Sequence, residues 1–148
     1  MSEYEVKLEG TEELLKNLAK ISSDIRDSVA VKAVTAGAEQ ISGRAKDNAP
    51  VLTGALRNSA VVEGRNQDGQ SVAEIIFGRG LSYAKIQEFG GTITAKNKPY
   101  LVFQYKGQWM RKKSVTINGK HYLGNAIEQE KSNAVDAMSD VVRRFLEK

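Results

Sequence analysis

Few residues in this chain have the types and spacing that catalysis or metal binding requires. His121 is the only histidine, and the 148 residues include no cysteine. A metal site would therefore depend on carboxylates, and no group of Asp and Glu residues has the spacing of a calcium-binding loop. A Ser-His-Asp arrangement would have to use His121, but no Gly-x-Ser-x-Gly turn is present to hold the serine. We predict a protein that is not an enzyme and needs no cofactor or metal, with His121 in a structural or interface role.

One segment has the glycine and serine spacing of a phosphate-binding P-loop. Gly64 and Gly69 are followed by Gln70 and Ser71, but Gln70 occupies the position of the lysine that contacts the phosphates. The segment also continues as a predicted strand, whereas a P-loop leads into a helix whose N-terminus binds the phosphates. We interpret this segment as the turn of a β-hairpin.

A basic segment is the remaining candidate for a functional site. From Lys96 to Lys120 there are seven basic residues and no acidic one, so the rest of the chain is net negative although the whole has a net charge of +4. Such asymmetry suggests an anionic partner, either nucleic acid or an acidic protein surface. A solubilising hairpin with charged outward faces would have the same composition.

Aromatic residues alternate with these basic residues, as they do on surfaces that stack single-stranded nucleic acid. In a β-hairpin, aromatic side chains more often fill the apolar face. The sequence contains no motif of a sequence-specific DNA- or RNA-binding domain. The aromatic residues are Tyr100, Phe103, Tyr105 and Trp109.

Length and composition are those of one ordinary globular domain, residues 1–148. The chain is 41% hydrophobic and 27% charged, and no apolar run approaches the roughly 20 residues of a membrane span. The acidic N-terminus resembles no secretory signal. We expect a protein folded in a cytoplasm, without a membrane partner.

The first third of the chain is expected to be one strand followed by a long helix. Residues 3–9 alternate polar and apolar side chains, as a half-buried strand does. Apolar residues from Leu14 to Ala45 then recur at helical spacing. An unbroken helix to Asn48 would be about 55 Å long, so we predict a break near the potential N-cap at residues 22–24. Small residues in the later half would let another backbone approach.

The helix must end at Pro50, because proline lacks a backbone N–H and disfavours helical geometry in the residue before it. Thr53 is placed to accept a turn hydrogen bond, and Gly54 tolerates a sharp reversal. Leu56 is expected in the core, with Arg57 at the corner. Taken alone, the composition of residues 49–59 indicates an ordinary helix-to-sheet turn.

The second half of the chain predicts mainly antiparallel strands. Residues 59–63 and 71–77 should form a hairpin around Asp68-Gly69, followed by a short helix over residues 82–89 with Ser82 as its N-cap. Residues 92–95 favour a strand, and residues 100–105 and 109–117 predict a long basic hairpin, with residues 96–119 projecting from the body. A last helix spans residues 122–146. The predicted class is α+β, with an antiparallel sheet packed against the long N-terminal helix and the C-terminal helix.

Several short patterns, in this order and spacing, resemble a family of tailed-bacteriophage proteins described as tail-component, tail-completion or head–tail joining proteins. Phage virion-morphogenesis proteins are related to it. Members often have Arg-Pro-aromatic-Leu before the last helix, whereas this chain has Lys120-His121-Tyr122-Leu123. The patterns are Ala45-x-x-x-Ala49-Pro50, Thr53-Gly54-x-Leu56-Arg57-x-Ser59, Tyr83-Ala84-x-Ile86-x-Glu88-Phe89-Gly90 and Tyr122-Leu123 with Ala126-Ile127.

The resemblance implies a structural protein of the virion neck. It would form a homo-oligomeric ring, expected to be a hexamer, between the head-closure or connector protein and the tail terminator protein, with DNA passing through the channel. The basic hairpin would then line the channel or dock on an acidic neighbour, and Arg57 would fix the corner or pair between subunits. The residues implied in these contacts are Arg57, Lys96, Lys98, Arg111, Lys112 and Lys113.

A small basic module that binds nucleic acid without sequence preference is the alternative. Such a module would bind DNA as a free monomer, with a salt dependence set by several phosphate contacts. A ring subunit should bind DNA poorly alone, because its charges act together only in the assembled ring.

Overall fold

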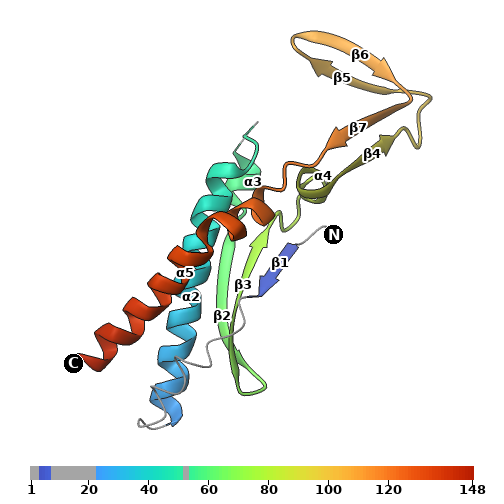
Figure 1. Ribbon diagram of the computed structural model, residues 1–148. Helices are drawn as coiled ribbons and strands as arrows, with labels where there is room; N and C mark the ends of the chain where they lie inside the picture. The colour runs from blue at the N-terminus through green and yellow to red at the C-terminus, as the bar shows by residue number, and fades with distance from the viewer. Residues whose placement is uncertain (1–3, 8–22, 52–53) are drawn as a thin grey trace.

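Two long antiparallel helices lie beside a small sheet, and a slender β arm extends from one end of this body (Figure 1). The computed structural model describes residues 4–7, 23–51 and 54–148. The predicted α+β class is confirmed, with a long helix, antiparallel sheets and a C-terminal helix. The predicted N-terminal part of the long helix and the role of Thr53 lie outside the described residues.

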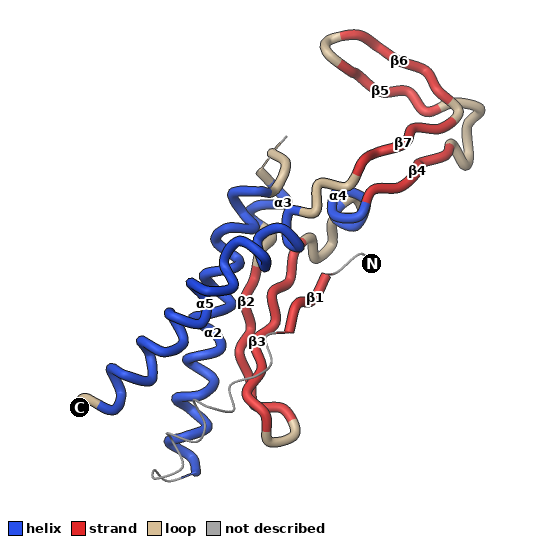
Figure 2. The backbone as a smooth tube through the Cα atoms, viewed as in Figure 1, coloured by secondary structure: helices blue, strands red, loops and turns tan. Residues whose placement is uncertain are grey.

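Helix α2 (Ser23–Asn48) and helix α5 (Tyr122–Leu146) form the centre of the body and run side by side in opposite directions (Figure 2). Helix α2 is described from Ser23 onward and ends just before Pro50, as predicted. The predicted break at residues 22–24 lies at the edge of the described residues and stays a prediction. The two helices approach closely at Gly37, where an added side-chain carbon would lie 2.8 Å from Cγ of Met138. The small residues of α2 therefore admit another helix, as their composition indicates.

The main sheet has the order β1–β3–β2 and is antiparallel throughout. Its strands are β1 (Tyr4–Lys7), β2 (Val61–Gln67) and β3 (Gln70–Phe77). Asp68 and Gly69 form the turn between β2 and β3 with φ of 52° and 80°, the left-handed geometry that such short hairpins prefer. The prediction ended the first strand at residue 63, which is wrong, because backbone pairing continues through the polar residues to Gln67.

Helix α2 crosses this sheet at Gly64 of β2. A side-chain carbon at Gly64 would overlap Oγ1 of Thr35 and lie 3.3 Å from Cγ1 of Val31. The Thr35 hydroxyl donates a 2.7 Å hydrogen bond to the Val31 carbonyl, which fixes its position. The absence of a side chain at Gly64 therefore sets how closely the helix and the sheet pack.

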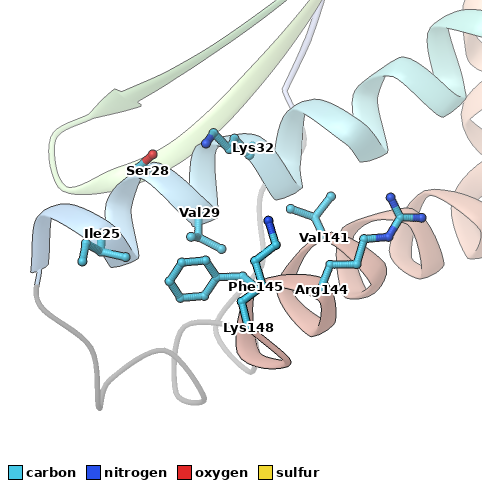
Figure 3. Close-up of a pocket in the computed structure, with 8 residues that line it drawn as sticks. All are labelled: Ile25, Ser28, Val29, Lys32, Val141, Arg144, Phe145 and Lys148. Carbon is cyan, nitrogen blue, oxygen red and sulfur yellow. The ribbon is translucent and has the colours of Figure 1, made fainter.

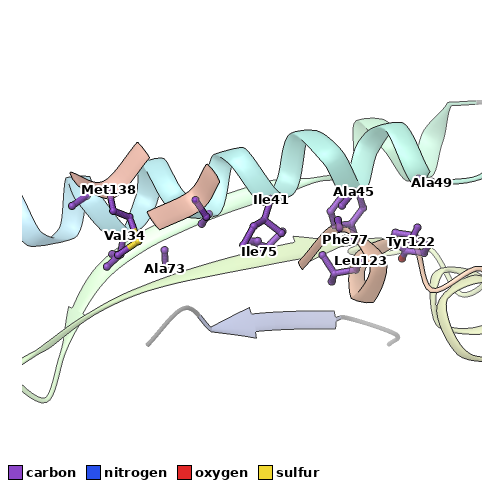
Figure 4. Packing of buried hydrophobic residues seen from close by; sticks show 14 of the residues in the cluster. Val34, Ile41, Ala45, Ala49, Ala73, Ile75, Phe77, Tyr122, Leu123 and Met138 are labelled. Carbon is purple, nitrogen blue, oxygen red and sulfur yellow. The ribbon is translucent and has the colours of Figure 1, made fainter. Parts of the chain in front are cut away.

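The core lies between α2, β3 and the inward side of α5, from Tyr122 to Val142 (Figure 4). Phe77 and Tyr122 are fully buried, with ring centroids 5.3 Å apart. The short helix α3 (Ala55–Asn58) adds Leu56, which is buried as predicted. Other core residues include Val34, Ile41, Ala45, Ile75 and Leu123.

The arm comprises residues 90–118 and follows helix α4 (Ala84–Phe89). Its stalk pairs β4 (Gly90–Thr94) with β7 (Ser114–Asn118), and its tip hairpin pairs β5 (Leu101–Tyr105) with β6 (Gln108–Lys112). The predicted continuous strand over residues 109–117 is therefore wrong, because its second half returns to pair with β4. The helix cap is also corrected, since Tyr83, not Ser82, is the N-cap of α4.

Candidate functional site

The arm has no core of its own. None of its residues is buried, and large apolar side chains on it are exposed to solvent. Two-stranded ribbons are at best marginally stable by themselves. The arm is therefore a surface suited to contact with another molecule.

The predicted basic residues of the arm are all exposed and lie between the end of β4 and the start of β7. Lys96 and Lys98 lie in the loop between β4 and β5, Arg111 and Lys112 lie on β6, and Lys113 precedes β7. No aspartate or glutamate occurs within residues 90–118. The structure thus brings five of the six predicted contact residues onto one arm.

Arg57, the sixth predicted contact residue, lies on α3 in the body. Its Nε donates a 2.8 Å hydrogen bond to the carbonyl of Lys46, in the last turn of α2. It also lines a shallow pocket of about 530 Å³ together with Glu39, Arg44 and Asp47. Because this lining mixes both signs of charge, it does not favour an anion.

Glu130 joins the two long helices beside this pocket. The residue is 2% exposed, and its carboxylate accepts hydrogen bonds from Asn133 (2.8 Å), Gln40 (3.1 Å) and Arg44 (2.8 Å). Hydrogen bonds from Asn133, Gln40 and Arg44, in that order, outweigh desolvation and lower the pKa of Glu130 from 4.5 to about 2. Glu130 is therefore ionised at neutral pH and holds α5 against α2.

The exposed face of the tip hairpin combines apolar side chains with a guanidinium group. Val102 lies opposite Arg111 and Gln104 lies opposite Trp109, so these side chains share a face. Trp109 is 75% exposed and Val102 is 58% exposed. The guanidinium of Arg111 lies 5.5 Å from the ring centroid of Tyr100. We call this the outer tip face. The sequence predicted only part of it, because Val102 lies in an ordinary strand pattern that does not indicate its exposure.

The other face of the tip hairpin is more sheltered. Phe103 and Met110 lie opposite each other and are half-buried. The expectation that aromatic residues fill an apolar face therefore describes Phe103, whereas Trp109 and Tyr105 are largely exposed.

The base of the arm is tied to α5 by Glu88, whose role was not predicted from the sequence. The residue is 4% exposed, and its carboxylate accepts 3.0 Å hydrogen bonds from the backbone N–H groups of Leu123 and Gly124. Its backbone carbonyl accepts a 3.0 Å hydrogen bond from the N–H of His121. In the sequence, Glu88 appears only as one position of the family pattern Tyr83-Ala84-x-Ile86-x-Glu88-Phe89-Gly90. The structure places it on the buried side of α4, with Ala84.

A groove opens at the other end of the helix pair (Figure 3). Its volume is about 480 Å³, and the apolar residues Ile25, Val29, Val141 and Phe145 line it. Basic side chains also line it, from Lys32, Arg144 and Lys148. This groove suits an apolar partner with negative charge.

Neither a metal centre nor a membrane span is found in the part of the chain that the structure describes. Within it, no three His, Asp or Glu residues gather as metal ligands. No helix there has the length and apolar character needed to cross a bilayer.

Comparison with known proteins adds a family to this geometry. The family model described as "Bacteriophage HK97-gp10, putative tail-component" matches residues 12–90, more than half of the chain. Neither a curated protein nor a solved structure matches this sequence. The matched residues include α2, the Pro50–Ser59 corner, β2, β3 and α4, and they end where the arm begins. This chain therefore belongs to the HK97-gp10-like family of bacteriophage tail components.

Proposed function

We propose that this tail-component protein is a subunit of a ring in the virion neck, between the head connector and the tail terminator. The ring is proposed to be a hexamer that surrounds the DNA channel, and the whole chain acts as one domain. Family membership supports a structural virion protein. The observation that favours a ring subunit is the projecting, coreless arm, since such an element gains stability from a neighbouring molecule.

The charge of the arm suggests what that neighbouring molecule is like. Lys96, Lys98, Arg111, Lys112 and Lys113 are exposed on an element without acidic residues. Such a surface lowers the electrostatic cost of holding DNA in a channel, or docks on an acidic protein face. Either contact requires no base-specific recognition.

A structural role also agrees with the contacts that the buried acidic side chains make. Among the described residues, the buried carboxylates are those of Glu74, Glu88 and Glu130. Glu74 pairs with Arg65, Glu88 caps α5, and Glu130 joins α5 to α2. Because each is engaged in holding the fold, none is offered as an acid or base to a substrate.

The test is electron microscopy of a lysate from a phage or prophage that lacks this gene. DNA-filled heads beside separate, finished tails are the expected result, because a neck ring is needed only to join the two. Heads with aberrant or absent tails would move the protein to tail assembly. Normal virions would contradict the proposal.

The alternative, a free nucleic-acid-binding module, is favoured by one specific observation, the exposed Trp109 beside basic residues. It predicts that the purified monomer binds single-stranded DNA and that affinity falls steeply with salt. The ring-subunit proposal predicts weak binding by the monomer. Fluorescence anisotropy with a labelled oligonucleotide at several salt concentrations separates the two.

A further inference from the structure

We propose that the outer tip face of one copy docks on the outward side of α5 in a second copy. This inference rests on the proposed ring and names the contact between its subunits. The partner of the tip is then a protein, and the surface that receives it is one side of a single helix.

The outer tip face has the composition of a protein-binding surface. Trp109 and Val102 are largely exposed, and Arg111, opposite Val102, lies against the Tyr100 ring. Tryptophan, tyrosine and arginine are the residues that most often dominate binding energy at protein interfaces. DNA phosphates would leave Val102 without an apolar partner, so the face fits protein better than a channel lining.

The outward side of α5 offers complementary chemistry. Val135 is 54% exposed in the middle of the helix. Glu128 is exposed seven residues before it, on the same side of the helix, and Asp136 is exposed next to it in sequence, about 100° further around the helix. Lys131 is exposed one turn before Val135 on the same side, and the two carboxylates outnumber this one positive charge. Together they supply an apolar centre for Trp109 and carboxylates for Arg111.

The groove of Figure 3 is a poorer site for the tip. Its floor is apolar, but Lys32, Arg144 and Lys148 surround it. An arm with six basic residues and no acidic residue would be repelled there. Charge therefore selects the α5 side over the groove.

The contact must form between copies. In Figure 1 the arm extends away from the body, so the tip does not lie on α5 of its own chain. The two docking patches differ, one on the arm and one on the helix, which makes the contact head-to-tail. Contacts of this kind close into rings when the rotation between subunits allows it.

Engineered cysteines provide a clean test, because the chain has none of its own. Phage particles would be made with the double variant Trp109→Cys/Val135→Cys and with the control pair Trp109→Cys/Ile25→Cys, which places the second cysteine at the groove. After mild oxidation, non-reducing gels of the first particles should show a ladder of disulfide-linked copies. The control particles should show at least about tenfold less linked protein, because charge disfavours that contact.

Charge exchange tests the same contact by another route. Arg111→Glu, added to the first pair, should reduce linkage about tenfold, and adding Asp136→Arg should restore it, because attraction is re-established with opposite signs. Electron microscopy of the same particles shows whether necks are intact. Intact necks without a ladder, or Trp109→Cys linked to a different virion protein, would overturn this inference and leave the ring proposal standing. Normal virions without the gene would instead overturn the ring proposal.

Discussion

The carboxylate of Glu88 accepts a 3.0 Å hydrogen bond from the backbone N–H of Leu123 and thereby caps the helix that follows the arm. The N-cap residue of α5, His121, is in the left-handed conformation and provides no side-chain cap. A helix N-terminus carries unpaired N–H groups and a partial positive charge, both of which a carboxylate satisfies. Glu88 precedes the arm and Leu123 follows it, so this contact fixes both chain ends at the base of the arm.

Replacing Glu88 with Gln is expected to destabilise the protein by about 1–3 kcal/mol, because a buried donor is left with a weaker partner and the charge is lost. Urea unfolding followed by circular dichroism measures the change. Glu39→Gln, at an exposed position on α2, is the matched control and should change stability by less than about 0.5 kcal/mol. Equal stability of the two variants would show that the cap contributes nothing.

Glu130 makes stability depend on pH in the acid range. Its pKa is lowered to about 2 in the folded protein, mainly by hydrogen bonds from Asn133, Gln40 and Arg44, whereas the unfolded chain retains about 4.5. The unfolded state therefore binds more protons in this interval. The stabilisation is fully present above the unfolded pKa and is lost as pH falls toward about 2. Glu130→Gln should flatten this part of the stability profile, measured by thermal melts from pH 6 downward.

Glu128→Gln is the control for that profile, because Glu128 is exposed on the same helix. Its profile should keep the slope of the wild-type protein. An unchanged slope in Glu130→Gln would mean that other carboxylates account for the acid sensitivity.

Neither carboxylate could be assigned from the sequence, because each depends on partners far along the chain. Glu130 meets Gln40 across ninety positions, and Glu88 meets Leu123 across thirty-five. Helical periodicity predicts that a residue lies on a helix, but it does not identify the residues that pack against it from other elements. Features with a local cause were predictable. The Asp68-Gly69 turn follows from backbone preference, and α5 has the predicted bounds because its apolar spacing is regular.

The arm illustrates the same limit within a sheet. Strand-favouring residues stand at both ends of residues 109–117, with Arg111 to Ser114 between them. The sequence does not show that pairing changes partner after Lys112. The change depends on the segment 90–94, which needs its own partner strand. The partner contacts of the six residues stay predictions, since the structure shows only their contacts within this chain, such as that of Arg57 with the Lys46 carbonyl.

Gly64→Ala should destabilise the protein by about 1–3 kcal/mol, because the new methyl group would overlap the fixed hydroxyl of Thr35 in α2. Adding Thr35→Ala should recover part of the loss, since it removes the overlapping atom. Gly43→Ala is the matched control: nothing lies within 4 Å of the new carbon, and the exposed helical position should gain up to about 1 kcal/mol. Denaturant midpoints compare the stability of the wild-type protein, the two single variants and the double variant. An unchanged stability in Gly64→Ala would contradict the close approach of α2 to the sheet.

Arg57→Ala separates the two roles predicted for that residue. Losing its hydrogen bond to the Lys46 carbonyl should cost about 1–2 kcal/mol, because the bond involves a charged donor at the end of a helix. Arg57→Lys keeps the charge but not the Nε donor. If Arg57 only fixes the corner, both variants should lose similar stability and support normal phage titre once folded. A low titre from stably folded Arg57→Ala, with normal titre from Arg57→Lys, would indicate a charge contact between subunits.

Neutralising the basic end of β6 is expected to damage the virion without unfolding the protein. The triple variant Arg111→Ala/Lys112→Ala/Lys113→Ala removes three exposed charges from the arm, so titre in a complementation assay should fall about tenfold or more as an anionic partner loses attraction. The control Lys32→Ala/Arg144→Ala/Lys148→Ala removes the same charge from the groove and should retain titre. Separate heads and tails from the triple variant would favour protein docking, whereas joined particles that eject DNA slowly would favour a channel lining. Wild-type titre would show that these charges have no role in the particle.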